Sequence, residues 1–146
     1  KYSMNKKILV FVFDGKEFLI LHSKPHPKHG NGGWFTITGS VEAGESSIDA
    51  VKREIKEETN LKTPEILDLK WGSRYSWGGE DNLENNFFAL VKRDKIVLNE
   101  EHDDFEWIGL EEFIKKINWD SDKEELKNVL QRAIKRELFF KKEKII

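Results

Sequence analysis

The chain has 146 residues, of which 38% are hydrophobic and 36% charged, and its formal net charge at pH 7 is −2. This length suits one domain, and ten Phe and five Trp supply enough apolar volume for a packed core. The near-neutral charge argues against a nucleic-acid partner, the absence of cysteine excludes disulfides and thiolate metal sites, and the apolar runs are too short to cross a bilayer.

The two ends of the sequence suggest no targeting segment. Near the N-terminus, lysines precede only a short apolar stretch, which is unlike a secretory signal. With no cysteine, we expect a cytoplasmic protein. The residues before Met4 look like an expression remnant and residues 141–146 like a solvated tail, so we expect one domain over residues 1–146.

The first two predicted strands form a hairpin. Residues 7–13 are apolar and rich in β-branched and aromatic side chains, 14–16 is an Asp-Gly-Lys turn sequence, and 17–22 is apolar again. Residues 24–33 hold prolines and glycines among basic residues, which indicates a loop, and 34–38 predicts a short strand.

A glycine-bearing turn at residues 39–44 leads into a predicted helix. Ser46 is suited to cap its N-terminus, with Asp49 three residues later as the capping-box partner. Apolar residues then recur at helical spacing up to about residue 59. Asn60 is suited to a left-handed helix end, so the helix is expected over residues 46–59.

The second half of the chain alternates strands and helices. The pattern predicts strands at 61–77, 83–91 and 106–109, a short helix at 110–117 and an amphipathic helix at 121–140. Together with the first half, these elements predict a single α/β unit built on a mixed sheet.

Three glutamates of the first predicted helix indicate a metal site. Glu54, Glu57 and Glu58 stand at i, i+3 and i+4, so they share one helix face on which like charges repel. Mg²⁺ and Mn²⁺ bind several carboxylate oxygens in a small volume, and a tight turn before a helix brings backbone groups to a metal or a phosphate. A solvated acidic face balanced by nearby lysines is the alternative interpretation.

The segment from Gly39 to Leu61 resembles the Nudix box, G-x5-E-x7-R-E-U-x-E-E-x-G-U, in which U is apolar. The matching positions are Gly39, Glu45, Arg53, Glu54, Ile55, Glu57, Glu58 and Leu61. Asn60 replaces the usual Gly, and Asn tolerates the left-handed helix end well. The order of elements is also similar to that of the Nudix α/β/α sandwich, with its central mixed β-sheet, over nearly the whole chain.

The resemblance implies metal-dependent hydrolysis of a nucleoside diphosphate linked to another group. The implied ligands of Mg²⁺ or Mn²⁺ are Glu54, Glu57, Glu58 and the backbone at Gly39. Either Glu54 or Glu57 would take the proton of the attacking water. Arg53 would orient a catalytic carboxylate, and Glu45 would brace the loop–helix junction through Arg53.

Sequence outside the box is similar to bacterial dihydroneopterin triphosphate diphosphatases. The similarity lies in T-G-S-V-E at 38–42 and in the stretches that hold Arg74, Tyr75 and Glu84; a further stretch at 101–108 is shared widely among Nudix proteins. It favours dihydroneopterin triphosphate or another nucleoside triphosphate as substrate. ADP-ribose, a dinucleoside polyphosphate, and a silent nucleotide-binding module remain alternatives.

A pterin or purine ring needs an aromatic slot in which to stack. The candidates are Trp34, Phe35, Tyr75 and Trp77, each of which is otherwise a core residue. Arg74 would pair with a terminal phosphate or lie on the surface, whereas Glu84 and Glu101 would add a metal ligand or base. Substrate contacts are thus expected from Trp34, Arg74, Tyr75 and Glu84.

The loop before the third predicted strand is basic. Its His26 and His29, with Lys24 and Lys28, would line the substrate mouth or belong to a flexible loop. We expect a small-molecule nucleotide or pterin triphosphate as partner, no nucleic acid and no membrane, and a monomer or homodimer.

Overall fold

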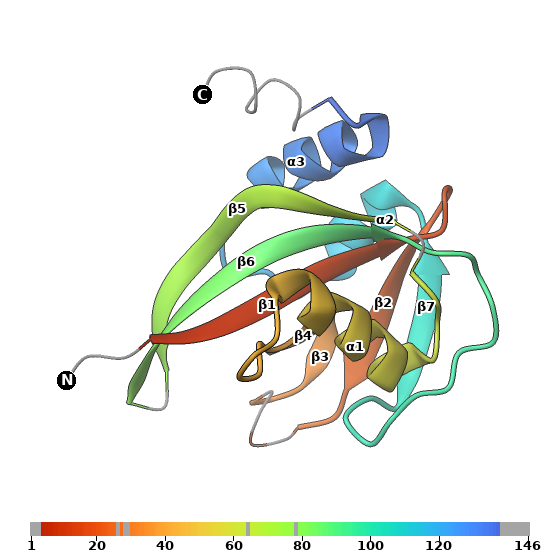
Figure 1. Cartoon of the computed structure of the whole chain (residues 1–146). Helices are drawn as coiled ribbons and strands as arrows, with labels where there is room; N and C mark the ends of the chain where they lie inside the picture. The colour runs from red at the N-terminus through yellow and green to blue at the C-terminus, as the bar shows by residue number, and fades with distance from the viewer. Residues whose placement is uncertain (1–3, 26, 28–29, 64, 78, 138–146) are drawn as a thin grey trace.

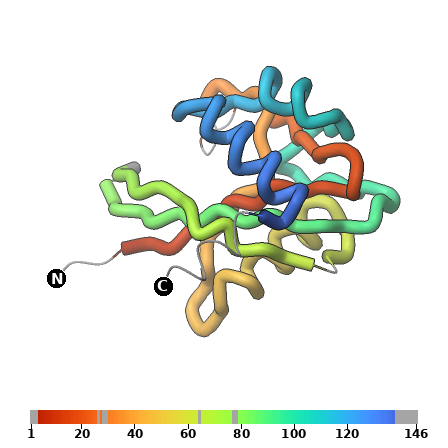
Figure 2. Tube along the Cα trace, turned by 90° about the horizontal axis from the view of Figure 1, so that it is seen from above, coloured from red at the N-terminus to blue at the C-terminus, as the bar shows by residue number. Residues whose placement is uncertain are grey.

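A mixed β-sheet runs through the centre of the molecule, with helices on both of its faces (Figure 1, Figure 2). The computed structural model describes residues 4–25, 27, 30–63, 65–77 and 79–137. The strands are β1 Met4–Phe13, β2 Phe18–Ser23, β3 Gly33–Phe35, β4 Ile37–Ser40, β5 Glu65–Trp77, β6 Glu80–Leu90 and β7 Asp104–Ile108. The helices are α1 Ser47–Thr59, α2 Leu110–Lys116 and α3 Lys123–Lys135. The predicted α/β class with a mixed sheet is confirmed.

Strand β1 organises the sheet. It pairs in parallel with β6 along its whole length, and β6 pairs antiparallel with β5. The expected hairpin is present at its turn, where Phe13 pairs with Phe18. Beyond that pair β1 and β2 diverge, so that β4 pairs with β1, β3 pairs with β2, and β7 takes the other edge of β2. This divergence places β3 and β4 between the two arms of the hairpin.

The core has two layers because β1 is buried on both faces. Leu9, Phe11 and Phe13 belong to the cluster on the side of α2 and α3, and the alternate residues of the strand, Ile8 and Val10 among them, belong to the cluster on the side of α1. Side chains alternate across a strand, so burial on both faces requires a continuous apolar run. Figure 2 shows α1 on one side of the sheet and α2 and α3 on the other.

Helix α1 begins and ends close to the predicted positions. Ser46 accepts a hydrogen bond from the Asp49 N–H (3.1 Å), and Asn60 adopts the left-handed conformation with φ 66°. The buried side chains of the helix include Ala50, Val51 and Ile55, which pack into the α1-side core. Because this stripe faces the sheet, the box residues on the neighbouring helix face are directed toward β4.

Several boundaries differ from the predictions. The expected strand at 34–38 is divided into β3 and β4 at Thr36, whose hydroxyl donates to the Val10 carbonyl (2.5 Å). The last helix was expected to reach residue 140 but ends at Lys135, because Arg136 is left-handed (φ 57°). The guanidinium of Arg136 pairs with Glu65 of β5. No helix in the described ranges is long and apolar enough to span a membrane.

Candidate active site

A cleft of about 720 Å³ lies beside the glycine-bearing turn of the box. One wall is made by β4 and by the face of α1 that carries Arg53, Glu54 and Glu57. The opposite wall is made by the ends of β1, β5 and β6, and Glu101 and Asp120 reach the cleft from loops. The topology brings these segments together because β1 pairs with β4 on one edge and with β6 on the other.

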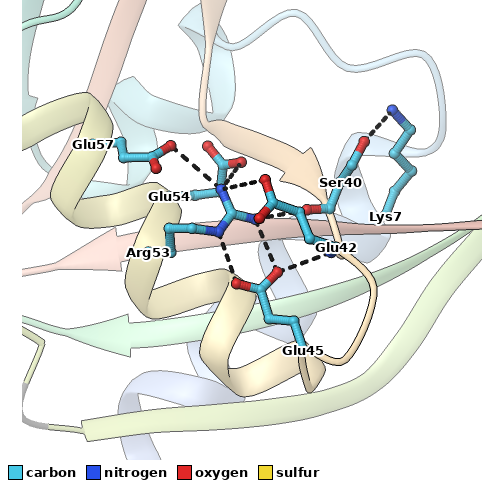
Figure 3. A network of polar contacts seen from close by, with 7 residues as sticks. All are labelled: Lys7, Ser40, Glu42, Glu45, Arg53, Glu54 and Glu57. Atoms are coloured by element: carbon cyan, nitrogen blue, oxygen red, sulfur yellow. Dashed lines mark hydrogen bonds and ion pairs between the residues drawn. The ribbon is translucent and has the colours of Figure 1, made fainter.

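Arg53 joins the turn, the helix and β4 (Figure 3). Its Nε and Nη2 donate to the two carboxylate oxygens of Glu45 (2.8 and 3.0 Å), and Nη2 also donates to the Ser40 carbonyl (2.8 Å). Its Nη1 donates to Glu54 (2.9 Å) and to Glu57 (3.3 Å). These five hydrogen bonds use all five N–H donors of a guanidinium, so Arg53 holds two candidate catalytic carboxylates at fixed places.

The hydrogen bonds between Arg53 and Glu45 keep both side chains charged by shifting their pKa values in opposite directions. The hydrogen bond from Arg53, followed by one from the Glu42 backbone N–H, lowers the pKa of Glu45 from 4.5 to about 2. In return, the hydrogen bond to Glu45 raises the pKa of Arg53 above its ordinary value. A bidentate, charge-assisted pair of this kind is among the stronger polar contacts in proteins, and it ties the middle of α1 to the turn that precedes the helix.

Gly39 is needed because Glu54 lies against it. A Cβ on Gly39 would lie 2.6 Å from Glu54 Cγ and closer still to the Glu54 carboxylate. A side chain at this position would have to displace the Glu54 carboxylate, which is hydrogen-bonded to Arg53. The requirement comes from close approach between β4 and α1, and it explains physically why the box begins with glycine at this position.

Glu58 lies behind the cleft wall and is only 2% exposed. Burial raises its pKa well above the ordinary value, and the neighbouring Glu54, Glu101 and Glu57 raise it further. Nδ1 of the equally buried His102 lies 3.4 Å from a Glu58 carboxylate oxygen. Buried carboxylates that face one another are costly unless a proton or a cation compensates them.

This set of side chains fits a hard divalent ion. Glu54, Glu57 and Glu58, with Glu101 nearby, offer only oxygen donors, which Mg²⁺ and Mn²⁺ prefer. Over the described ranges, no three acidic or imidazole side chains are already gathered as a metal site, and Nη1 of Arg53 bonds both Glu54 and Glu57. Each of these bonds uses one carboxylate oxygen, so the second oxygen of Glu54 and of Glu57 would be the one that binds the ion, and the predicted ligation stays a prediction.

The opposite wall carries Lys7, Tyr75 and Glu84. Lys7 pairs with Ser40 across one edge of β1 and with Glu84 across the other, and its Nζ donates to Ser40 Oγ (2.9 Å). The Tyr75 hydroxyl donates to Glu84, and burial raises the pKa of both groups. For Glu84, burial outweighs the opposite effects of Lys7 and of the Tyr75 hydrogen bond. This wall offers a cation, a carboxylate and an aromatic ring to a ligand.

Two predicted substrate contacts do not lie in this cleft. Trp34 packs with the α2/α3-side core, its ring under Lys116 Nζ (4.2 Å to the ring centroid) and edge-on to His22 (4.9 Å between centroids). Arg74 is outside the lining because neighbouring residues of a strand point to opposite faces and Tyr75 takes the cleft side. Neither residue lines the cleft, so their proposed contact with substrate stays a prediction, and the aromatic residue of β3 that does line the cleft is Phe35.

Of the other candidate residues, Tyr75, Glu84 and Glu101 line the cleft and Lys24 does not; their proposed roles toward substrate or metal stay predictions. The Trp77 side chain and residues 26, 28 and 29 lie outside what the structure describes, so the proposed roles of His26, His29 and Lys28 stay predictions.

Sequence reasoning missed three residues of the cleft, Lys7, Asn82 and Asp120. The sequence does mark Lys7, because it is the last charged residue of β1 before the apolar run that is buried on both faces. Asn82 belonged to a predicted turn and is instead inside β6, opposite Tyr75. Asp120 follows α2 in a loop, and nothing in the sequence pattern pointed to it.

Comparison with known proteins identifies a family. The NUDIX domain model matches residues 5–130. The chain is 35% identical over 118 residues to a protein named octanoyltransferase from Myxococcus xanthus, covering 77% of this chain and 32% of that one. It is 32% identical over 108 residues to the NAD-capped RNA hydrolase NudC of Mannheimia succiniciproducens, covering 72% and 39%. The chain thus spans only about a third of the length of these curated relatives.

Solved structures share the fold along nearly the whole chain. The MutT protein from Methanosarcina mazei Go1 superposes with a TM-score of 0.70 at 19% identity, over 94% of this chain and 96% of that one. The dihydroneopterin triphosphate pyrophosphohydrolase of E. coli has a TM-score of 0.64 at 24% identity, over 82% and 90%. A C. elegans Ap4A hydrolase has a TM-score of 0.64 at 25% identity, over 89% and 93%.

Proposed function

The chain belongs to the Nudix family, and we propose that it hydrolyses a diphosphate linkage in a nucleotide-like substrate with Mg²⁺ or Mn²⁺. The observation that carries the proposal is the hydrogen-bonded set in which Arg53 holds Glu45, Glu54 and Glu57 at the wall of the cleft. A silent binding module has no need to keep these acidic side chains together against their mutual repulsion.

For the substrate we favour dihydroneopterin triphosphate or another nucleoside triphosphate. Phe35 and Tyr75 provide aromatic surface in the cleft, and the carboxylate of Glu84 can accept hydrogen bonds from a pterin or guanine ring. A volume of about 720 Å³ suits a ligand of this size. ADP-ribose and dinucleoside polyphosphates remain the alternatives, since relatives of the chain include an Ap4A hydrolase and NAD-capped RNA hydrolases.

Of the two candidate bases, Glu57 is favoured. Its side chain is 56% exposed, and its hydrogen bond to Arg53 (3.3 Å) uses one carboxylate oxygen, so the other oxygen is open to a water in the cleft. Glu54 is 14% exposed and is held by Arg53 and Gly39, which suits a fixed ligand. A divalent ion bound by these carboxylates would supply charge neutralisation of the phosphates and a more acidic water.

The activity is tested by measuring release of phosphate and pyrophosphate in the presence of Mg²⁺. The substrates are dihydroneopterin triphosphate, the nucleoside triphosphates, ADP-ribose and diadenosine polyphosphates. A preference for the pterin of about 100-fold in kcat/KM, or about 2.7 kcal/mol, would select that substrate. A flat profile across nucleotides would contradict the pterin assignment, and no turnover of any substrate would overturn the hydrolase proposal.

The role of Glu57 is tested by Glu57→Gln. The variant should lose at least about 10²-fold in kcat, because it removes a proton acceptor or a metal ligand. The thermal unfolding temperature should stay close to that of the wild type, because the side chain is more than half exposed. Lys56→Gln, an exposed change on the same helix, is the matched control. Near-wild-type turnover of Glu57→Gln would contradict the assignment.

A further inference from the structure

The described lining of the cleft is mainly acidic. Its carboxylates are Glu42, Glu54, Glu57, Glu84, Glu101 and Asp120, and its cations are Arg53 and Lys7. A polyphosphate that enters such a cleft carries several negative charges of its own. The charge of the ligand must therefore be neutralised by bound metal ions and by a protein cation whose N–H groups are not already used in other hydrogen bonds.

Arg53 has none to give. Its five N–H donors are used by Glu45, Glu54, Glu57 and the Ser40 carbonyl. A phosphate that took one of these donors would release a catalytic carboxylate or the turn that precedes α1. Binding the substrate through Arg53 would thus disrupt the arrangement that the chemistry requires.

Lys7 is held differently. Its Nζ donates to the neutral hydroxyl of Ser40 (2.9 Å; Figure 3), and within the described ranges no carboxylate forms an ion pair with it. An ammonium group has three donors, so two remain after the bond to Ser40. If Lys7 served only as the counter-ion of Glu84, its partner on β6, a direct ion pair between the two would be expected.

The position of Lys7 also separates the two parts of the cleft. On one side, Ser40 follows Gly39, whose Cα lies against the Glu54 carboxylate. On the other side, Glu84 and its hydrogen-bond partner Tyr75 form the wall that suits a heterocycle. On the opposite wall, Lys7 is therefore the residue that reaches the box through Ser40, and a phosphate that joins an organic group on this wall to a metal at the box would lie beside it.

We propose that Lys7 binds a non-bridging oxygen of the substrate phosphate that carries the organic group, with Ser40 holding the ammonium in place. The proposal rests on the proposed function only in taking a nucleotide as the ligand. It makes Lys7 a substrate-binding residue that contacts the phosphate and leaves the ring to Tyr75 and Glu84.

The test separates the phosphates from the ring. Lys7→Met and Lys7→Gln both remove the ammonium, Lys7→Arg keeps a cation, and Lys6→Gln removes the same charge from the exposed neighbour on the other face of β1. Isothermal calorimetry with Mg²⁺ measures the Kd of α,β-methylene-GTP, which is not hydrolysed at that linkage, and of guanosine.

The expected result is a Kd for the triphosphate that rises about 10- to 100-fold in Lys7→Met and Lys7→Gln, the size of a lost hydrogen bond to a charged group. Guanosine should bind these variants within about twofold of the wild type, Lys7→Arg should recover most of the triphosphate affinity, and Lys6→Gln should match the wild type. Thermal unfolding identifies any variant that is not folded. If one of Lys7→Met and Lys7→Gln does not fold, the other is sufficient for the comparison.

Two outcomes would overturn the proposal. One is equal triphosphate binding by the neutral Lys7 variants and Lys6→Gln, and the other is a parallel loss of guanosine and triphosphate affinity. Wild-type protein that binds the analogue but hydrolyses no substrate would overturn the proposed function alone, since the Kd comparison needs no turnover. Wild-type protein that binds no triphosphate would overturn the role of Lys7.

Discussion

The two walls of the cleft differ in how firmly their side chains are held. On the box wall, Arg53 makes five hydrogen bonds to groups that lie within residues 40–57. On the opposite wall, Lys7 has one bond to Ser40, 33 residues away, and Tyr75 has one to Glu84 on the next strand. The first wall is preorganised, whereas the second has groups that a ligand can engage.

This difference matches a division of labour. Stabilising charge in a transition state requires dipoles and carboxylates that do not reorganise during the reaction. Recognition of an organic group requires donors and acceptors that are still available when the ligand arrives. A change on the box wall should therefore reduce the rate for every substrate, and a change on the opposite wall should alter which substrate binds.

Gly39→Ala should have the largest effect. The added Cβ would overlap the Glu54 side chain and push this carboxylate away from β4. Displacing a catalytic group by about 1 Å can cost about 10²-fold, so kcat should fall by about that factor for all substrates. Steady-state kinetics on several substrates measures this.

Gly109→Ala is the matched control for that prediction. Nothing lies within 4 Å of a Cβ built on Gly109, and its φ is −69°, so alanine fits without strain. It should leave kcat unchanged. A Gly39→Ala variant that loses activity toward one substrate only would contradict the proposed separation between the two walls.

The Arg53–Glu45 pair should make stability depend on acid pH. The folded-state pKa of Glu45 is about 2, below its ordinary 4.5, so its contribution to stability is present above pH 4.5 and is lost as the pH falls toward 2. In Glu45→Gln, the unfolding temperature should be lower than that of the wild type at pH 7, and the difference should shrink from pH 4.5 to pH 2. Thermal melts across this range measure it.

Glu42→Gln is the control for the pH experiment. The Glu42 carboxylate is 3.9 Å from Arg53 and mostly exposed, so its loss should change the unfolding temperature little at any of these pH values. A difference between wild type and Glu45→Gln that stays constant down to pH 2 would show that the Glu45 charge does not contribute through this pair.

Tyr75→Phe should have the smallest effect. It removes the hydroxyl that donates to Glu84 and keeps the ring. One lost hydrogen bond should raise KM by about 2- to 10-fold with kcat unchanged. Without the bond the pKa of Glu84 should rise further. Protonated Glu84 is a poorer acceptor for the substrate ring, so KM should rise as the pH falls, and in the variant this rise should begin at a higher pH than in the wild type. A fall in kcat at constant KM would place Tyr75 in the chemical step instead.

The box wall was predictable from the sequence because its residues are local. Ser46 and Asn60 bound helix α1, and the spacing of Glu54 and Glu57 places both on one helix face. The turn before the helix is short, so the position of Glu45 is restricted, and its side chain meets that of Arg53, eight residues later in the chain. Local geometry, not long-range packing, decides these contacts.

The opposite wall was predicted only in part. Tyr75 and Glu84 were identified through resemblance and do line the cleft, but Trp34 and Arg74 point elsewhere. A strand offers two faces, and a shift of one residue exchanges them. Trp34 and Phe35 are neighbours within β3, so they point to opposite faces, with Trp34 at the core and Phe35 at the cleft.

By itself, the sequence determined the family box, helix α1 with its two caps, and the alternation of strands and helices. Periodicity and capping act over a few residues, and that range is visible in a linear chain. Only the tertiary structure decided that β1 and β2 diverge, that β6 pairs with β1 in parallel, and that Lys7 consequently stands between Ser40 and Glu84. Strand pairing joins residues more than 30 positions apart, and its register depends on the burial of both sheet faces at once.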